Sequence, residues 1–315
     1  MKIIGLILFQ SFLSLGSVSQ ESCFNQGSSL SDDDMFLVSG NHSESVSGSA
    51  FTQLHSYSII DSERESIPAF SCIDNNNLTE EFLLQGPFRR VLGGIIQGDS
   101  SQKKIALVFT GHEFADGGET ISRTLKKEKV KGSFFLTGDF YRLFPALVNQ
   151  LQKEGHYLGA HSDKHLLYAD WGKRDSTLVT REAFRKDLQD NYQTMTKAGI
   201  NPPVKKFFLP AYEWYNQDVS NWCTELGVQL INFTPGTTSN ADYTVPQMKN
   251  YRSSEEIYRN IMNYELKHTL NGFMLLIHIG TDSKRTDKLY DILDELIDAL
   301  KSKGYEFVRV DELLK

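Results

Sequence analysis

Two histidines follow one short apolar segment, and a third ends another apolar segment much later in the chain. His161 and His165 come directly after residues 157–160 (Tyr-Leu-Gly-Ala), and His278 follows residues 273–277 (Phe-Met-Leu-Leu-Ile). One helical turn between two histidines can point both imidazoles at a single spot, which suits a divalent metal such as Zn²⁺. A catalytic zinc also needs a third protein ligand and an open position for water, so we expect a carboxylate nearby.

The segments around these histidines alternate between strand and helix patterns. From Lys103 onward, apolar runs predict strands at residues 105–109, 133–136, 157–160, 207–209, 228–233, 273–279 and 306–310. Helical spacing predicts helices at residues 121–129, 141–154, 181–198, 217–226, 254–270 and 286–303. Strands that alternate with helices indicate a parallel sheet, and continuous apolar strands indicate burial on both faces.

Polar and unusual residues follow the first six predicted strands at the same end. They lie at residues 111–113, 137–139, 161–165, 210–216, 234–243 and 278–282. A closed parallel barrel carries its site on that rim, whereas an open sheet uses a crevice at a switch point. The sequence therefore predicts an α/β fold with a seven-stranded (β/α) barrel, and an open doubly wound sheet is the alternative.

Aromatic residues crowd the same predicted rim. They are Phe140, Tyr141, Tyr168, Trp171, Tyr212, Trp214, Tyr215 and Tyr243. Flat rings can stack on the apolar faces of sugars, and they can equally pack barrel loops together. Tyr212 and Trp214 are our candidates for substrate binding, and both interpretations of the aromatic group stay open.

The composition is ordinary for a soluble globular protein, and the N-terminal residues predict export. The chain has 315 residues, 40% hydrophobic and 23% charged, with a formal net charge of −7. No basic patch with interleaved aromatics is present, which argues against a nucleic-acid partner. Lys2, the apolar run 3–15 and the small residues up to Ser19 predict a signal peptide at residues 1–19. No other segment approaches the length of a membrane span, so we expect a periplasmic or extracellular protein.

Residues 20–100 differ from the rest of the chain because they are rich in Ser, Asn, Asp and Gly. We predict a small β-rich, partly loose appendage there, with short strands at residues 35–38, 55–60 and 89–96. Cys23 and Cys72 could form a disulfide in an oxidising compartment, and a lipid anchor at Cys23 is the second possibility. Cys223 is predicted to be an inert core residue.

Several motifs in order resemble the polysaccharide deacetylases, carbohydrate esterase family four. The segment His161-Ser162-x-x-His165 resembles that family's His-(Ser/Thr)-x-x-His motif. Residues 106–109, 132–138, 210–216 and 275–278 resemble its first strand, second strand, substrate-groove motif and final Leu-x-x-His motif. The resemblance runs from Lys103 to the C-terminus, so residues 101–315 are interpreted as a barrel domain of this family.

This resemblance implies a distorted seven-stranded barrel and a Zn²⁺-dependent removal of acetyl groups, N-linked or O-linked, from an acetylated oligo- or polysaccharide. It implies that His161 and His165 bind the metal and that His278 is the general acid that protonates the leaving amine. It also implies that Leu275 lines the pocket for the acetyl methyl, and that the backbone amide of Ala211 or Tyr212 helps to hold the oxyanion.

The first motif departs from the family pattern. The family ends its first strand with two consecutive aspartates, and this chain has Thr110 and Gly111 near that point. We predict Glu113 as the third metal ligand and Asp116 as the base. The open alternatives are His112 as the ligand with Glu113 as the base, or a plain helix N-terminal turn with Asp116 as its cap.

Other positions also diverge. Leu209 stands where the family has an arginine that supports the base, and Glu213 stands where glycine is frequent. Asp242 is a candidate to orient His278, and is equally a candidate turn residue. The joint loss of the base aspartate and its arginine indicates a rewired subgroup.

Our first hypothesis is an exported metal-dependent carbohydrate deacetylase. The second is a decayed deacetylase barrel that binds glycan, which the missing aspartates favour and the three retained histidines oppose. The third is another metal-dependent amidohydrolase that acts on a small molecule.

Overall fold

The computed structural model of the protein describes residues 87–315. The predicted signal peptide, the Cys23–Cys72 pair and the predicted strands at residues 35–38 and 55–60 lie outside the described residues. The predictions that the structure can address therefore concern the region that carries the three histidines.

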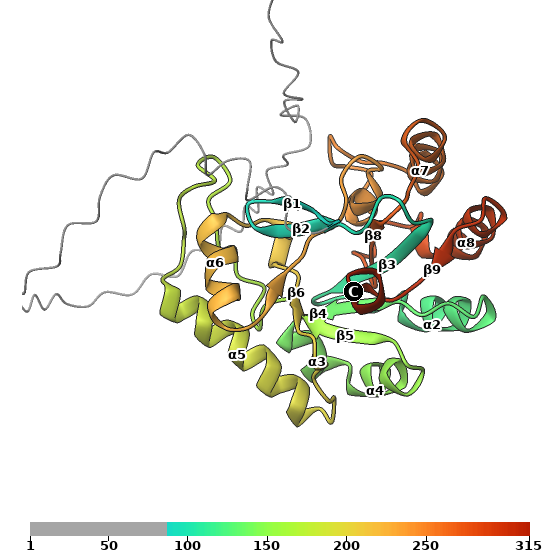
Figure 1. Ribbon diagram of the computed structural model, residues 1–315. Coiled ribbons are helices and arrows are strands. Elements are labelled where there is room, and N and C mark those ends of the chain that lie inside the picture. The colour runs from blue at the N-terminus through green and yellow to red at the C-terminus, as the bar shows by residue number, and fades with distance from the viewer. Residues whose placement is uncertain (1–86) are drawn as a thin grey trace, which may run out of the picture. The chain divides into compact units, whose positions relative to one another are not determined.

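Seven parallel strands form the centre of this region (Figure 1). They are β3 (Lys104–Gly111), β4 (Ser133–Leu136), β5 (Tyr157–Ala160), β6 (Phe207–Phe208), β7 (Gln229–Leu230), β8 (Phe273–His278) and β9 (Glu306–Phe307). The hydrogen-bonded order is β7-β6-β5-β4-β3-β8, and β9 pairs with the start of β3. Every one of these pairs is parallel. Each strand overlaps a predicted apolar run, so the predicted strands and the α/β class are confirmed.

A hairpin lies against both ends of this strand order. β1 (Arg89–Val91) and β2 (Gly94–Gln97) pair antiparallel, and the two residues between them, Leu92 and Gly93, have φ of 45° and 79°. This left-handed pair matches the twist of the two flanking strands. Ile95 bridges Ile231 beyond β7, and the amide of Gly98 donates to the carbonyl of Gly272 before β8.

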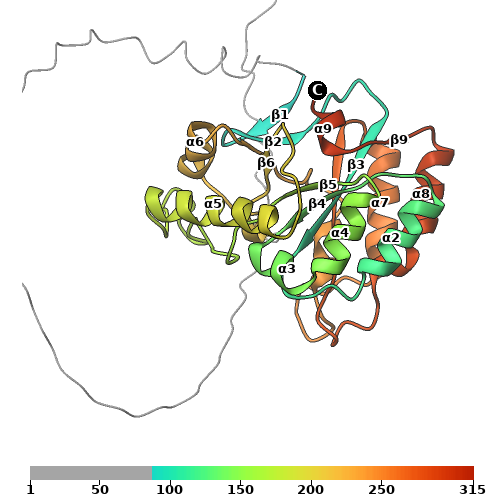
Figure 2. The same ribbon diagram turned by 90° about the horizontal axis from the view of Figure 1, so that it is seen from below.

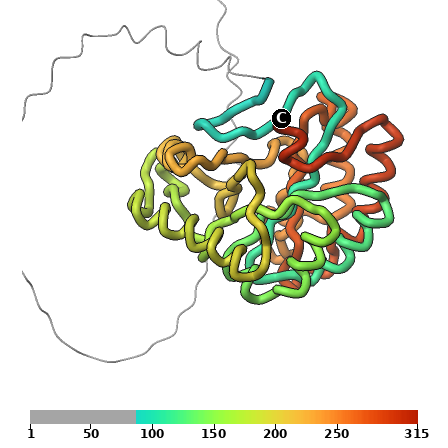
Figure 3. The backbone as a smooth tube through the Cα atoms, turned by 60° about the horizontal axis from the view of Figure 1, so that its bottom comes forward, coloured from blue at the N-terminus to red at the C-terminus, as the bar shows by residue number. Residues whose placement is uncertain are grey.

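The hairpin corrects one prediction. Residues 89–96 were predicted to form a single strand of the N-terminal appendage, whereas they form two short strands that pack on the barrel. Together with residues 231–234, β2 covers the gap between β7 and β8, and the result is the distorted (β/α) barrel. Figure 3 shows the hairpin next to the C-terminal segment of the chain.

Helices surround the strands. They are α2 (Gly118–Lys127), α3 (Gly138–Leu143), α4 (Pro145–Lys153), α5 (Arg181–Lys197), α6 (Gln217–Glu225), α7 (Ser254–His268), α8 (Leu293–Ser302) and α9 (Val310–Leu313). Figure 2 shows α2, α4, α7 and α8 grouped together, with α5 and α6 on the other side of the strands. Three short 3₁₀ turns, η2 (Ala211–Glu213), η3 (Ser239–Tyr243) and η4 (Leu289–Ile292), lie in the loops. Within residues 87–315, no helix combines the length and apolar character that crossing a membrane requires.

Two predicted helices have different limits in the structure. The predicted helix 141–154 is divided into α3 and α4 at Phe144, whose φ and ψ are −124° and 51°. Pro145 causes the break, since proline disfavours helical geometry in the preceding residue and suits the first position of a new helix. The predicted helix 286–303 starts later, with the 3₁₀ turn η4 leading into α8.

Alternate residues of β3 pack into two separate apolar layers. Ile105, Leu107 and Phe109 face the helices outside the sheet, while Ala106 and Val108 face the barrel interior. Both faces are therefore buried, as the unbroken apolar run predicts. Residues of α9 fill the interior at the end where the strands begin. The opposite rim, at the carboxyl ends of the strands, is left for the polar residues.

Candidate active site

Four histidines come together at the carboxyl ends of β3, β5 and β8. The rings of His112 and His165 stack with centroids 4.5 Å apart, and the centroids of His161 and His165 are 5.3 Å apart. His278 closes β8 beside Thr110 of β3 and is near enough to lower the pKa of both His161 and His165. The three histidines singled out in the sequence are thus brought to one place, and His112 joins them.

His161 has the state that a metal ligand needs. Its side chain is 2% exposed, and its Nδ1 lies 2.8 Å from the carbonyl oxygen of Leu209. Because that carbonyl can only accept, Nδ1 carries the proton and Nε2 keeps its lone pair free. Burial lowers the pKa of His161 to about 3 and holds the pKa of His165 well below its usual value. Both imidazoles are therefore neutral near pH 7.

A third ligand is not already in place. Within residues 87–315, no three side chains of the His, Cys, Asp and Glu types form a complete ligand set. The chemistry of His161 and His165 fits a divalent ion, but a neighbouring side chain would have to turn to complete the set. His112 is half-buried, with Nδ1 3.2 Å from the Thr137 hydroxyl, and Glu113 is exposed. Both remain predictions for the third ligand.

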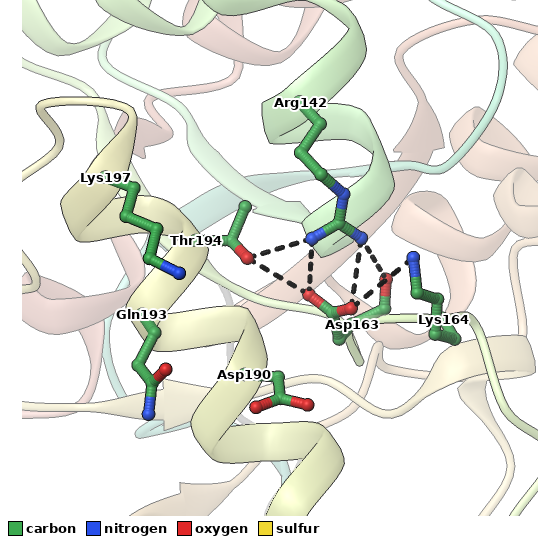
Figure 4. Close-up of a pocket in the computed structure, with 7 residues that line it drawn as sticks. All are labelled: Arg142, Asp163, Lys164, Asp190, Gln193, Thr194 and Lys197. Atoms are coloured by element: carbon green, nitrogen blue, oxygen red, sulfur yellow. Dashed lines mark hydrogen bonds and ion pairs between the residues drawn. The ribbon is translucent and has the colours of Figure 1, made fainter.

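The loop that carries the two histidines is held by charged and polar groups from α3 and α5. Asp163 lies between the histidines in sequence, and both its oxygens accept hydrogen bonds from Arg142 at 3.0 Å (Figure 4). The carboxylate of Asp187 in α5 accepts hydrogen bonds from the backbone amides of Asp163 and Lys164, at 3.0 and 3.2 Å. The side-chain oxygen of Asn191 accepts a hydrogen bond from the backbone amide of His161 at 2.9 Å. These contacts fix the backbone of the loop, including the positive φ of 55° at His165.

The cavity in Figure 4, about 320 Å³, belongs to this supporting network and not to the histidine cluster. It is lined by Arg142, Asp163, Lys164, Asp190, Gln193, Thr194 and Lys197. The Thr194 hydroxyl also donates a hydrogen bond to Asp163 at 3.2 Å. The carboxylate of Asp163 in this cavity is therefore already hydrogen-bonded by side chains of the protein.

Replacing Arg142 with glutamine is expected to lower the free energy of unfolding by about 1.5 kcal/mol, because Asp163 is buried and loses its bidentate partner. The side chain of Asp163 is 6% exposed but that of Arg142 is 39% exposed, so solvent screening reduces the effect below that of a fully buried pair. Urea unfolding of Arg142→Gln against the exposed control Arg123→Gln measures it. Equal unfolding midpoints for the two variants would show that the pair does not stabilise the loop.

His278 is held by a carboxylate. The backbone amide of His278 donates to Asp242 at 2.8 Å, and Nδ1 lies 2.6 Å from the other oxygen of Asp242, which is 1% exposed. Burial by itself lowers the pKa of His278, but the charge and hydrogen bond of Asp242 outweigh it, so the pKa is raised. Glu213 adds to this increase and Arg285 opposes it. Nδ1 is thus engaged, and Nε2 is free to donate a proton to a bound molecule.

Replacing Asp242 with asparagine should lower the pKa of His278, because its main stabilising charge is lost while Arg285 and the burial remain. A general acid works only while it is protonated. The alkaline limb of the pH profile of kcat/KM should therefore move to lower pH, with the turnover at low pH less affected. An unmoved alkaline limb in an active Asp242→Asn variant would rule out this role of Asp242.

Asp116 connects two loops. Its carboxylate accepts hydrogen bonds from the amide of Thr281 at 2.8 Å and from the hydroxyl of Tyr290 at 2.5 Å, and it pairs with Lys288 at 2.9 Å. Burial would raise the pKa of Asp116, but these three donors lower it. The cap interpretation is wrong, because α2 begins after Gly117 and has no side-chain cap. The base role of Asp116 stays a prediction, although a carboxylate with both oxygens engaged accepts protons poorly.

The end of β3 carries no acid. The hydroxyl of Thr110 is buried and has no hydrogen-bond partner within the described part of the chain. Gly111 has no room for a side chain, because a Cβ there would lie 2.6 to 2.9 Å from Ile279, Leu136 and Phe140. An aspartate at position 111 would therefore not fit without movement of these neighbouring side chains.

The substrate-binding candidates are placed differently. The ring centroid of Tyr212 lies 4.4 Å from that of His165, and the Tyr212 side chain is among the exposed aromatics of the rim. Trp171 contacts Tyr212 edge-on at 5.9 Å and stacks on Trp214 at 5.2 Å. Arg174 lies over the ring of Trp214 at 4.0 Å. These residues form a continuous row that leads away from the histidines.

Leu275 has no exposed surface and packs in the apolar layer between the sheet and the helices. The neighbouring residue Leu276 faces the barrel interior. A role for Leu275 in an acetyl pocket remains a prediction that this orientation does not favour.

Glu213 is the functional candidate that sequence reasoning named only as a departure. Its side chain is 13% exposed, and Oε1 lies 3.9 Å from Nε2 of His161. Burial raises the pKa of Glu213 to about 7, against a lowering by His278. The sequence did show a glutamate at a position where glycine is frequent. It could not show that the Glu213 side chain points toward His161, because that depends on backbone angles that the sequence does not reveal.

The comparisons with known proteins agree with this architecture. Residues 97–231 match the profile of a family described as Polysaccharide deacetylase. A Geobacillus stearothermophilus protein, described as an uncharacterized 30.6 kDa protein, is 29% identical over 70% of this chain and 75% of its own length. The Listeria monocytogenes peptidoglycan-N-acetylglucosamine deacetylase PgdA is 27% identical over 68% of this chain. That match spans only 39% of PgdA.

A solved structure shares the fold. A carbohydrate esterase family four pseudoenzyme from Bacillus anthracis has a TM-score of 0.57 and 20% identity, covering 72% of this chain and 70% of the other. A mutant of the same protein, described as having restored enzymatic activity, also has a TM-score of 0.57. The ordered motifs, the barrel and these matches lead to one conclusion: this chain is similar to the polysaccharide deacetylases, with the family profile matched over residues 97–231.

Proposed function

We propose that this protein is an exported, metal-dependent hydrolase that removes acetyl groups from a carbohydrate. The observation that carries the proposal is the pairing of two neutral histidines, His161 and His165, with the Asp242–His278 pair at one rim. Three features in one place, a metal-competent pair, an oriented acid and a partly exposed aromatic row, suit hydrolysis of an acyl group on a sugar.

In this proposal each group has a separate role. His161 and His165 would hold the ion, and a divalent ion so bound supplies Lewis acidity to an acyl carbonyl and a lowered pKa to a water molecule. His278 gives its Nε2 proton to the leaving nitrogen or oxygen, while Asp242 keeps the ring in the productive orientation. The amide of Tyr212 or Ala211 lies in the same loop and is the candidate donor to the oxyanion.

The substrate class rests on the aromatic row and on the relatives. Tyr212, Trp171 and Trp214 form a path of rings from His165 outward, which can stack on successive sugar faces. PgdA of Listeria is a peptidoglycan-N-acetylglucosamine deacetylase, so acetylated glucosamine polymers are the first substrates to test. Export is supported by the signal-peptide pattern of residues 1–19.

One observation favours a different class, a glycan-binding protein without catalysis. The end of β3 carries Thr110 and Gly111 where the resemblance implies two aspartates, and position 111 has no space for a side chain. The Bacillus anthracis relative of the same fold is itself described as a pseudoenzyme. The second proposal keeps the aromatic row as a binding surface and assigns no reaction to the histidines.

Acetate release separates the two proposals. The zinc-loaded protein is incubated with N-acetylglucosamine oligomers and with O-acetylated glycan, and free acetate is measured beside the His278→Ala variant. Acetate release that depends on His278 supports the deacetylase. Tight glycan binding by calorimetry without acetate release supports the binding protein. Activity confined to small amides would assign the protein to another class of amidohydrolase.

A further inference from the structure

Glu213 has a backbone conformation that a glutamate adopts only at a cost. Tyr212 and Glu213 have φ of 60° and 53°, two consecutive non-glycine residues in the left-handed region. Such residues persist where the surroundings impose them, and they gather at functional sites. The side-chain amide of Asn232 donates to the carbonyl of Glu213 at 2.6 Å, and the Glu213 amide donates to Pro210 at 3.0 Å. The turn is therefore held in this shape from both sides.

This turn directs the carboxylate toward the histidine cluster. Glu213 Oε1 lies 3.9 Å from His161 Nε2, the nitrogen that faces away from the Leu209 carbonyl. The charge of Glu213 acts on His278 and on Tyr243 as well, so the carboxylate lies among groups from three different loops. Within residues 87–315, no hydrogen-bond donor is recorded on either of its oxygens, in contrast with Asp116 and Asp242.

The rest of the cluster offers no comparable acid. Thr110 has a hydroxyl, Gly111 has no room for a side chain, and Asp116 is engaged by three donors. Asp242 is bound to His278 through both oxygens, and Glu113 is exposed. Among the described residues, Glu213 is thus the largely buried carboxylate at the site whose oxygens are not committed to another group.

We propose that Glu213 is a catalytic residue, the carboxylate that accepts the proton of the attacking water in place of the absent strand-end aspartates. This inference rests on the proposed deacetylase function. The water oxygen forms a bond to the acetyl carbonyl carbon while its proton passes to Glu213 Oε1. The C–N or C–O bond to the sugar then breaks, His278 gives its proton to the leaving atom, and the product leaves as acetic acid, which loses its remaining proton to solvent and becomes acetate. Glu213 returns its proton to solvent, and His278 regains one.

Two variants test the assignment. Glu213→Gln keeps the shape and removes the proton acceptor, so kcat for acetate release should fall by about 10²–10³-fold. Zinc affinity should stay within about threefold of the wild type, because Glu213 is assigned to the water and not to the ion. Glu213→Gly removes the strained side chain, so the midpoint of thermal unfolding should rise while the activity stays lost. The exposed residue Glu306 supplies the matched control, Glu306→Gln.

Each result is decisive. A Glu213→Gln variant that retains wild-type kcat overturns the assignment and leaves the deacetylase proposal standing. A large loss of zinc affinity in that variant also overturns it, because Glu213 would then be a ligand. Wild-type protein that releases no acetate refutes the deacetylase proposal and this assignment with it. Lower thermal stability together with lost activity in Glu213→Gly would show that the carboxylate only supports the turn.

Discussion

Replacing His278 with alanine is expected to lower kcat for acetate release by about two to four orders of magnitude. The reason is that an amine or alkoxide leaves slowly unless it is protonated as the bond breaks. His278 is the one imidazole of the cluster that has a carboxylate bonded to Nδ1 and a pKa raised above its usual value, so it is the one prepared to give up a proton. The neighbouring His161 and His165 have lowered pKa values and are not protonated near pH 7.

The measurement is acetate release under saturating substrate, beside zinc content and the exposed control His268→Ala. Zinc content should be unchanged in His278→Ala, because the predicted ligands lie after β3 and β5 and not on β8. Full activity in His278→Ala would remove the acid role from this residue. Loss of both zinc and activity would instead place His278 among the ligands.

Replacing His161 with alanine is expected to abolish the binding of a divalent ion. The purified wild type should hold about one zinc per chain after reloading, and the variant should bind it at least about 100-fold more weakly. Removing a metal ligand lowers the metal affinity more than removing a group that only hydrogen-bonds to a ligand. The buried Nε2 of His161 also has no substitute at that position. Acetate release should disappear together with the metal.

The experiment measures metal content and affinity by competition with a chelating dye, with His268→Ala as the control and thermal unfolding as the check of folding. Because the Nδ1 of His161 also contacts the Leu209 carbonyl, a modest fall in the unfolding midpoint is expected in the variant. No bound zinc in the wild type, even after reloading, would contradict the metal-dependent proposal and favour the glycan-binding protein.

The sequence was sufficient for the strands and for the grouping of the histidines. The seven apolar runs predicted the strands because a parallel strand is buried on both faces and reads as a continuous apolar run. Since parallel strands all end at one edge, residues that follow different strands had to meet. His161, His165 and His278 could therefore be assigned to one rim without knowledge of any contact.

The sequence predicted the local breaks less well. Residues 89–96 have the composition of one strand, but Leu92 and Gly93 turn the chain back, and the hairpin packs against residues that come more than a hundred positions later. Phe144 interrupts a helix whose apolar spacing continues across Pro145. In both cases the decisive information is a backbone angle at one or two residues, which hydrophobic periodicity does not report.

The roles of the acid groups depend mainly on the tertiary structure, although the sequence already offered Asp242 as a candidate to orient His278. Counting along the chain from β3 gives Glu113 and Asp116 as candidates, yet Asp116 is bound by Thr281, Tyr290 and Lys288, which come from another part of the chain. Asp242 and Glu213 come from separate loops; Asp242 binds His278, and the charge of Glu213 raises the pKa of the same residue. Sequence order thus determined the fold and the histidine site, since both follow from periodicity and from the ends of strands. The carboxylates depend on long-range packing and on left-handed backbone angles, which only the folded chain imposes.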